Sequence, residues 1–405
     1  MKKPVVMVAV WLLAAISQAQ APGPSPADNL GLALEQAWAH HPQAQVFDAR
    51  AAQANARSEL ATGLTPAPPS MSLSNVSDRL NAATGKEAWE LELAVPMWLP
   101  GQRAAQGREA QGVQTEVAAQ RTALRLQLAA EVRDAWWALA AARNALALAT
   151  HRETAAKTLQ ADVQRRLKAG ELARIDANLA DLEQLTAESE ALEAQTAVRQ
   201  AEQAYRTLTG ADAPQRLAEE AAPGSATPAA PHPQLVAAQA LAQLAQARVS
   251  VATHTGRDAP ELALRWVRDR GDTNAAYADS VGIKLTVPFG SGARQRLTNS
   301  AALADALQAD AELALTQQRL ELNVARAQRD AHTAQLQMAN AQERLTLTQD
   351  TLRLSEKAFA LGESDVASLL RARAAAFEAQ ALLNRQRIAR AASLSRLNQS
   401  LGVMP

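Results

Sequence analysis

Histidine is the side chain here best suited to metal binding or proton transfer, because the sequence contains no cysteine. His40 and His41 are adjacent, so on a helix their side chains point about 100° apart and form a poor chelate for one ion. His151, His254 and His332 are isolated in the sequence, and we expect them to face solvent. The histidines therefore predict no metal site.

Patterns typical of other chemistry are also missing from the sequence. It contains no Ser-His-Asp order, no Gly-rich phosphate loop and no paired-carboxylate motif. Glu188, Glu190 and Glu193 have the spacing of a solvated helix face. Without cysteine there are no disulfides, thiolate ligands, cysteine nucleophiles or lipid attachment through cysteine. We predict that the protein is not an enzyme and uses no cofactor.

Composition favours long helices. The 405 residues carry no net charge, so the total gives no sign of a nucleic-acid partner. Only 3% of the residues are aromatic, and Ala, Leu, Gln, Arg and Glu dominate. These residues are strong helix formers, whereas large globular cores usually draw much of their buried area from aromatic side chains.

The N-terminus has the pattern of a secretory signal peptide, predicted over residues 1–21. Lys2 and Lys3 precede an uncharged apolar run over residues 5–16, and Ala19 and Ala21 form an A-x-A cleavage signature. The alternative is a membrane anchor, although the run is short for a membrane-spanning helix. We expect an exported protein that begins near Gln20 or Pro22.

An internal repeat decides the fold class. Four pairs of similar segments share a separation of 191 or 192 residues: 41–43 with 232–234, 95–96 with 287–288, 168–171 with 360–363, and 208–210 with 400–402. Chance matches would not share one separation. We therefore predict a first repeat over residues 22–210, a Pro-rich linker over 211–233 and a second repeat over 234–405.

Each repeat contains one very long helix. No proline interrupts residues 101–170, and apolar side chains there recur every three or four positions. Such a helix would be about 100 Å long. The second repeat has the same pattern over residues 292–362. Shorter helices on either side, such as 42–63 and 172–208, could lie end to end beside the long one, with reversals near residues 170 and 362.

Two strand pairs alternate apolar and polar residues, at about residues 70–76 with 88–96 and 261–267 with 280–288. This alternation fits either a transmembrane barrel or a small soluble sheet packed on the helices. Four strands cannot close a barrel, so the membrane reading needs three protomers and twelve strands. In that reading Trp89 and Trp266 are interfacial anchors, and otherwise they are core residues. The predicted lipid-facing residues are Trp89, Leu91, Leu93, Val281, Ile283 and Leu285.

Together these features resemble the TolC-type outer-membrane efflux family over about residues 29–402. The resemblance rests on the tandem repeat, the strand pairs that enter long helices through Val95-Pro96 and Val287-Pro288 turns, and the opening segment 30–42. It also rests on the two segments that run from the reversals to the helix ends, 166–210 and 359–402. Each motif is weak alone, but their order and constant spacing are specific.

The resemblance implies a mainly α protein with long antiparallel coiled-coil helices in two tandem repeats and two short β-hairpins. It implies a homotrimer in which a twelve-stranded β-barrel continues into an α-helical tunnel, in the outer membrane and extending into the periplasm. Such channels receive substrates from an inner-membrane pump through a periplasmic adaptor, or membrane fusion protein. Outer-membrane lipid would surround the barrel.

The reversals would then form the periplasmic aperture and the adaptor-docking tip. Gly170 and Gly362 permit the tight turn between helices. Family members often carry Asp soon after both glycines, and this sequence departs from that pattern in the second repeat, where Ser368 stands in place of Asp. An acidic ring from the second repeat would need Glu363 or Asp365. The predicted tip residues are Gly170, Glu171, Asp176, Gly362, Glu363, Asp365, Ser368 and Arg371.

The turn at residues 99–103 resembles the branch of the family that serves heavy-metal cation pumps of the resistance-nodulation-division (RND) type. Metal cations are therefore one predicted substrate class. The alternative function is a periplasmic coiled-coil adaptor or scaffold. An adaptor would place one helical hairpin between β-rich domains, whereas this sequence predicts two hairpins and only short strand pairs.

Overall fold

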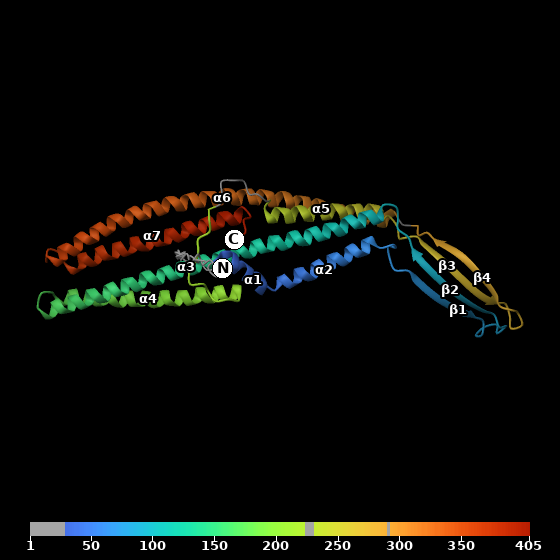
Figure 1. Ribbon diagram of the computed structural model, residues 1–405, viewed down its shortest axis with the longest axis horizontal. Coiled ribbons are helices and arrows are strands. Elements are labelled where there is room, and N and C mark those ends of the chain that lie inside the picture. The colour runs from blue at the N-terminus through green and yellow to red at the C-terminus, as the bar shows by residue number, and fades with distance from the viewer. Residues whose placement is uncertain (1–28, 223–230, 290–291) are drawn as a thin grey trace, which may run out of the picture.

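The computed structural model describes residues 29–222, 231–289 and 292–405. The predicted signal peptide at 1–21 lies outside the described residues, as does part of the predicted linker. Seven helices and four strands lie in the described part of the chain and form an elongated molecule (Figure 1). The predicted fold class is confirmed: the protein is mainly α, with long antiparallel helices in two repeats and two β-hairpins.

The two repeats have corresponding elements. The first contains α1 (Leu30–His40), α2 (Gln43–Thr62), β1 (Ser70–Ser77), β2 (Glu87–Pro96), α3 (Gln102–Lys168) and α4 (Arg174–Thr209). The second contains α5 (Pro233–His254), β3 (Glu261–Arg270), β4 (Ala278–Thr286), α6 (Gly292–Ala360) and α7 (Val366–Ser400). Because α3 and α6 run unbroken, each extends for about 100 Å at about 1.5 Å per residue.

The shorter helices pack along the long ones. Helices α3 and α4 form one antiparallel hairpin and α6 and α7 form the other, while α2 and α5 lie along the opposite halves of the long helices. In Figure 1 both hairpin tips lie at one end of the molecule and the sheet at the other. Among the helices of the described residues, none contains an apolar stretch of the length that a membrane span requires.

The four strands form one antiparallel sheet in the order β1-β2-β3-β4. The pairing of β2 with β3, in which Leu93 lies opposite Leu264, joins the two hairpins. No strand packs against a helix in the described ranges, and Figure 1 shows the sheet projecting from the helical body. The predicted alternative of a soluble sheet packed on the helices therefore does not describe this protomer.

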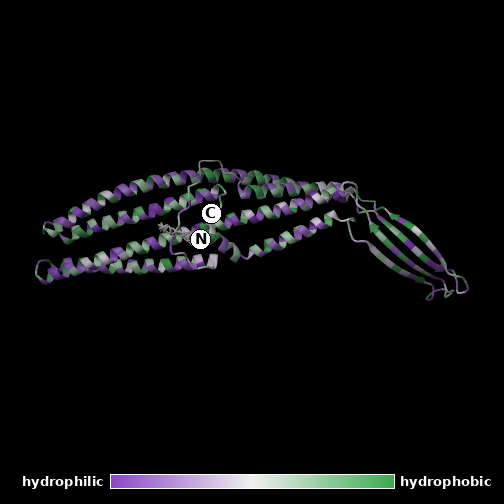
Figure 2. Cartoon of the chain, viewed as in Figure 1, coloured by the Kyte–Doolittle hydropathy of each residue, from purple (hydrophilic) through white to green (hydrophobic). Residues whose placement is uncertain are grey.

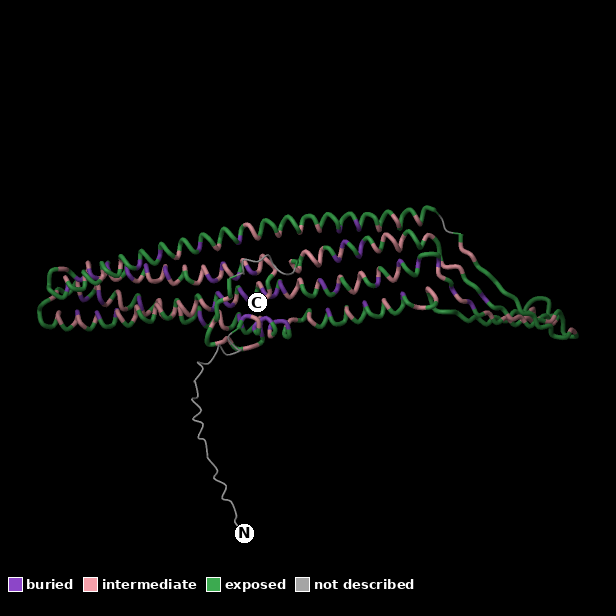
Figure 3. Tube along the Cα trace, turned by 45° about the horizontal axis from the view of Figure 1, so that its top comes forward, coloured by how far each residue is buried: buried purple, intermediate pink, exposed green. Residues whose placement is uncertain are grey.

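The core is distributed along the helices, with its largest cluster at mid-length. There α1, α3 and α4 bury Trp38, Trp136 and Tyr205. A second cluster joins the two hairpins at their tips, around Val163 and Leu369. Buried residues follow the lines where helices meet, and α6 is exposed along most of its length (Figure 3).

Candidate functional site

One face of the sheet is apolar and open to the surroundings. Alternate residues on neighbouring strands place Leu93, Leu264 and Ile283 side by side. Leu93 is 47% exposed and Ile283 is 78% exposed. Figure 2 shows apolar residues along the strands and hydrophilic residues in the loops at the end far from the helices. The six residues predicted to face lipid are all exposed in this protomer.

The opposite face of the sheet is polar and cross-linked by ion pairs. Arg265 Nε lies 2.5 Å from a carboxylate oxygen of Glu90, and Lys284 Nζ lies 3.1 Å from Glu92. These charges stand on the faces of β2, β3 and β4 that alternate with the leucines. The sheet therefore has one face suited to hydrocarbon and one suited to water.

The two tips have the same backbone geometry. Gly170 has φ 79° and Gly362 has φ 76°, both in the left-handed region. The N–H groups of Gly170 and Glu171 donate to the carbonyls of Leu167 and Arg166. The corresponding N–H groups of the second tip do the same, which is the Schellman pattern that ends a helix with its carbonyls satisfied. The sequence-based assignment of a glycine-dependent reversal matches this geometry.

Both tip aspartates cap the helix that follows. Asp176 accepts a hydrogen bond from Ala173 N at 3.2 Å, and Asp365 accepts one from Ser368 N at 2.8 Å. Hydrogen bonds from the Ser368 side chain and backbone lower the pKa of Asp365. The carboxylates thus stabilise the starts of α4 and α7, whatever further role they have at an aperture.

The tips of the two hairpins also pack on each other. Arg166 in α3 places its guanidinium 4.9 Å from the ring centroid of Phe359 in α6. Phe359, Val366 and Leu369 are buried in the shared tip cluster. A cation–π contact of this kind is worth about 0.5–1 kcal/mol at an exposed site. Arg166 was not singled out from the sequence, because its partner is 193 positions away.

The predicted tip residues gather at the same end of the molecule. Gly170, Glu171, Gly362 and Glu363 are exposed, and Arg371 donates to the Ser368 hydroxyl at 2.8 Å. Their assignment to an aperture or an adaptor contact stays a prediction. The contact geometry links Arg371 to α7 itself and not to the other tip.

A buried ionic cluster at mid-length was not anticipated. Arg133 is 2% exposed, and its guanidinium donates to both carboxylate oxygens of Glu220 at 3.0 and 2.6 Å. It also donates to Gln399 and, at 3.0 Å, to the carbonyl of Val403. One α3 side chain therefore holds the segment after α4 and the C-terminal segment together. An arginine within the apolar stripe that contains Leu128 and Val132 was the available signal.

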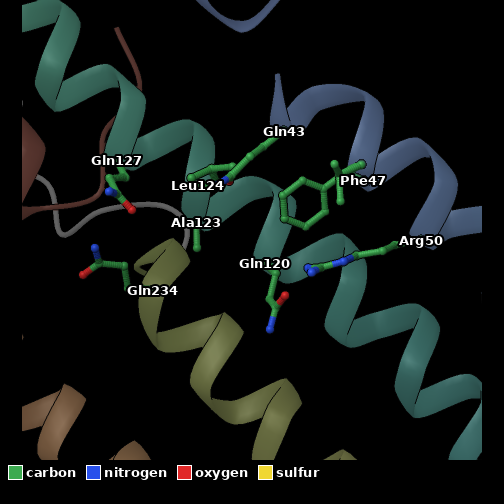
Figure 4. Close-up of a pocket in the computed structure, with 9 residues that line it drawn as sticks. Gln43, Phe47, Arg50, Gln120, Ala123, Leu124, Gln127 and Gln234 are labelled. Atoms are coloured by element: carbon green, nitrogen blue, oxygen red, sulfur yellow. The ribbon is translucent and has the colours of Figure 1, made fainter. Parts of the chain in front are cut away.

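In the described part of the chain, the cavity linings show no catalytic arrangement. The cleft in Figure 4, of about 560 Å³, lies between α2, α3 and the start of α5. Glutamines line it together with Arg50, whose guanidinium lies 5.5 Å from the Phe47 ring centroid. A larger groove of about 1160 Å³ runs between α3, α4 and α7 and is lined by alanines together with charged side chains such as Arg152, Glu190 and Arg385.

The histidines have local structural contacts. His41 accepts a hydrogen bond from Gln43 N at 3.2 Å, and His232 accepts one from Gln234 N at the same distance. His151 packs edge-on against Phe377 with ring centroids 5.8 Å apart. Among the described residues, no three His, Asp or Glu side chains are placed to hold a metal ion.

Comparison with known proteins connects this geometry to a family. Residues 229–403 match the family model described as outer membrane efflux protein. No curated protein sequence matches the chain. Several solved structures match over nearly the whole chain.

The outer membrane protein VceC of Vibrio cholerae has a TM-score of 0.75 at 18% identity, covering 92% of this chain and 96% of VceC. CusC, whose structures concern folding and transmembrane channel formation, has a TM-score of 0.77 at 16% identity, covering 96% of each chain. The open state of the Neisseria gonorrhoeae MtrE outer membrane channel has a TM-score of 0.73 at 15% identity, covering 93% of this chain and 89% of MtrE.

Because these structures are only 15–18% identical to the chain, the structural matches establish the fold alone. The similarity in sequence comes from the family model. The second repeat matches the outer membrane efflux protein family model, and the whole chain has the fold of solved outer-membrane channels.

Proposed function

We propose that this chain is one protomer of a homotrimeric channel whose three sheets close into a twelve-stranded barrel above a helical tunnel. The observation that carries the proposal is the pair of open sheet edges. In the described protomer β1 and β4 each pair on one side only, and every residue of both strands is exposed. An open edge in a membrane leaves backbone groups without partners, so closure needs further strands.

The order of strands fits such closure. Because the four strands alternate in direction, β4 of one protomer would run antiparallel to β1 of the next. Three copies would then give a continuous antiparallel ring with the apolar faces outside and the ion-paired face inside. Glu90, Glu92, Arg265 and Lys284 would line the water-filled interior.

A pair of substitutions on β2 tests this arrangement. Leu93→Arg places a cation on the apolar face and should cost about 2–4 kcal/mol per protomer if that face meets the bilayer. Glu92→Arg is the matched control, because it lies one residue away on the polar face. We expect Leu93→Arg to reduce heat-modifiable trimers in the outer-membrane fraction, and Glu92→Arg to assemble. Equal assembly of both variants contradicts the assignment, and a soluble periplasmic monomer in the unchanged protein favours the scaffold alternative.

We further propose that the hairpin tips form the periplasmic aperture and contact a periplasmic adaptor fed by an inner-membrane pump of RND type. The support is that both helix reversals lie at the end farthest from the sheet and share one buried cluster. Cysteines placed at Glu171 and Glu363 should crosslink to the adaptor, whereas a cysteine at Ser74 on β1 should not. Absence of crosslinks from both tips would locate docking elsewhere.

The acidic side chain at the first tip is testable separately. If the three Asp176 carboxylates of a trimer narrow the aperture, Asp176→Asn should raise single-channel conductance. The asparagine oxygen can still accept the Ala173 N–H bond, so the start of α4 is preserved. Unchanged conductance would limit Asp176 to its capping role.

Heavy-metal cations are the substrate class that the 99–103 turn supports. In the structure this turn has a packing role: Gln102 accepts a hydrogen bond from Leu99 N at 3.0 Å, and Gly101 adopts φ 78° against His254. Selection would then lie with the pump. Loss of the protein should raise sensitivity to metal cations and not to organic drugs, and the reverse pattern would reject this substrate class.

A further inference from the structure

The apolar face of the sheet ends in a defined cationic and aromatic patch. Along β3 the residues that share this face change from aliphatic to aromatic to basic towards the loop end: Leu262, Leu264, Trp266, Arg268 and Arg270. This end is the one farthest from the helices (Figure 1). The order matches the change from hydrocarbon to interface to headgroup across one leaflet of a membrane.

A tyrosine holds the two arginines in place. The guanidinium carbons of Arg268 and Arg270 each lie 4.9 Å from the ring centroid of Tyr277. The Tyr277 hydroxyl donates to a carboxylate oxygen of Glu87 at 2.8 Å, which fixes the ring on the sheet. Arginines stacked in this way lose less conformational freedom when they bind an anion than free side chains would.

Of the two arginines on this patch, one is paired with a carboxylate and the other is not, among the described residues. Arg270 lies 3.4 Å from Glu87, which also accepts a hydrogen bond from Trp89 Nε1 at 3.1 Å. Arg268 is exposed and forms no ion pair within 4.0 Å among the described residues, although Asp279 lies opposite it in the sheet register. The guanidinium of Arg268 can therefore donate to an external anion.

Two carboxylates near the patch accept hydrogen bonds within their own loops. Asp78 accepts from Thr84 N at 2.9 Å and from Gly85 N at 3.2 Å, and Asp272 accepts from Asn274 N at 2.7 Å. These hydrogen bonds direct both carboxylates towards their own turns. Asp269 stands on the opposite face of β3.

We propose that Arg268, supported by Arg270 and Tyr277, binds the phosphate of an anionic glycolipid in the outer leaflet of the outer membrane. Guanidinium groups bind phosphate through two directed hydrogen bonds. The leucines and Trp266 below them would contact the acyl chains of the same lipid. The inference rests on the proposed function, because it requires the apolar face to meet the bilayer.

The test uses the assembled protein in detergent and native mass spectrometry with bisphosphorylated lipid A. The double variant Arg268→Gln/Arg270→Gln should bind lipid A about tenfold more weakly, because the charge-assisted hydrogen bonds from Arg268 and the supporting charge of Arg270 are lost. Arg265→Gln is the matched control: it removes a cation from the same strand on the polar face. We expect this control to bind within about twofold of the unchanged protein.

Two further arms identify the ligand. Dephosphorylated lipid A should bind the unchanged protein as weakly as the double variant, and inorganic phosphate at equal concentration should not displace lipid A. Equal binding by the double variant, an equal loss in Arg265→Gln, or indifference to the phosphates would overturn the inference. Trimer assembly is measured separately, by heat-modifiable migration on gels. Failure of the unchanged protein to enter the outer membrane would reject the proposed function. Normal assembly without phosphate-dependent binding would reject only this inference.

Discussion

The long helices of the two repeats are similar in length and position but unequal in burial. Helix α3 packs against α1, α2, α4, α5 and α7 and buries large side chains such as Trp136. Among the described elements, α6 packs along its length against α5 and α7, meets α3 near the tip through Phe359, and buries mainly alanines such as Ala327, Ala334 and Ala341. The first repeat therefore supplies the packing centre of the protomer, and the second supplies an exposed wall.

The exposed side of α6 is apolar at regular intervals. At 100° per residue, its exposed leucines fall on one face, opposite the buried alanines. The leucines are Leu297, Leu303, Leu307, Leu315, Leu322, Leu336, Leu347 and Leu354. Exposed leucines that recur along one face of such a long helix are unusual on a monomer, although polar residues such as Arg329 lie between them. We infer that α6 is completed by a neighbouring protomer, on the side where β4 also has its open edge.

The largest expected effect is at the centre of α3. There Arg133→Ala removes the guanidinium that donates to the Glu220 carboxylate and to the backbone carbonyl of Val403. Breaking a buried ion pair by deleting one partner costs about 3–5 kcal/mol. Urea unfolding in detergent should show this loss. Arg125→Ala, which removes a pair with Glu35 near the surface of the same helix, should cost about 1 kcal/mol or less.

The charge of Arg133 and the packing around it can be separated. Because replacing a buried ion pair by apolar residues is often neutral, Arg133→Met combined with Glu220→Leu should recover much of the lost stability. Equal destabilisation by Arg125→Ala and Arg133→Ala would show that burial of an α3 ion pair does not determine how much it contributes to the free energy of unfolding.

The second effect concerns the exposed wall. Leu336 is 54% exposed in the protomer, so Leu336→Glu should leave protomer folding unchanged. If the stripe is buried in a trimer, each lost leucine contact should weaken assembly by about 2 kcal/mol, before the cost of burying the new carboxylate. Sedimentation or heat-modifiable gels measure the trimer fraction. Gln335→Glu is the control, since it adds the same charge one position away and off the stripe.

The sequence was sufficient for the repeat, the helices and the strand pairs, because each is encoded locally. Proline-free periodicity fixes α3 and α6, and strict alternation fixes the strands. The pairing of β2 with β3 and the difference between α3 and α6 depend on contacts between repeats. Arg133 with Glu220, and Arg166 with Phe359, join residues far apart in the chain, so spacing could not reveal them. The glycine tips were predictable, because the repeat places Gly170 and Gly362 at the same point of each hairpin.

At the tips the two repeats have the same backbone geometry. Equivalent substitutions there should therefore have equal effects, unlike substitutions along α3 and α6. Gly362→Val forces a β-branched side chain into the left-handed region and should cost about 1–2 kcal/mol locally. Gly170→Val should cost a similar amount. Trimer formation should persist in both, while channel closure or adaptor docking changes. Gly362→Asn is the control, because Asn tolerates this backbone conformation; equal defects in Asn and Val variants would contradict a conformational cause.

The smallest effect is at the joint where α5 begins beside the end of α7. His232 accepts the Gln234 N–H through Nδ1, which requires a neutral ring, and it also hydrogen-bonds the backbone of Gln399. Burial lowers the pKa of His232 below its usual value, while the Gln399 contact opposes the shift. Arg326, Asp330 and Arg396 line the same cavity as His232.

Because the folded state favours neutral His232, unfolding takes up a proton at mildly acidic pH. The stability that this histidine contributes is therefore complete above about pH 6.5, the value for an unfolded histidine, and is lost as the pH falls towards the lower pKa of the folded state. A helix cap is worth about 1 kcal/mol, which bounds the effect. Unfolding free energies measured between pH 7.5 and 5.5 should fall by up to that amount. His232→Asn keeps an acceptor that does not titrate, so its stability should change less over the same range, and an identical pH dependence in both proteins would assign the effect to another group.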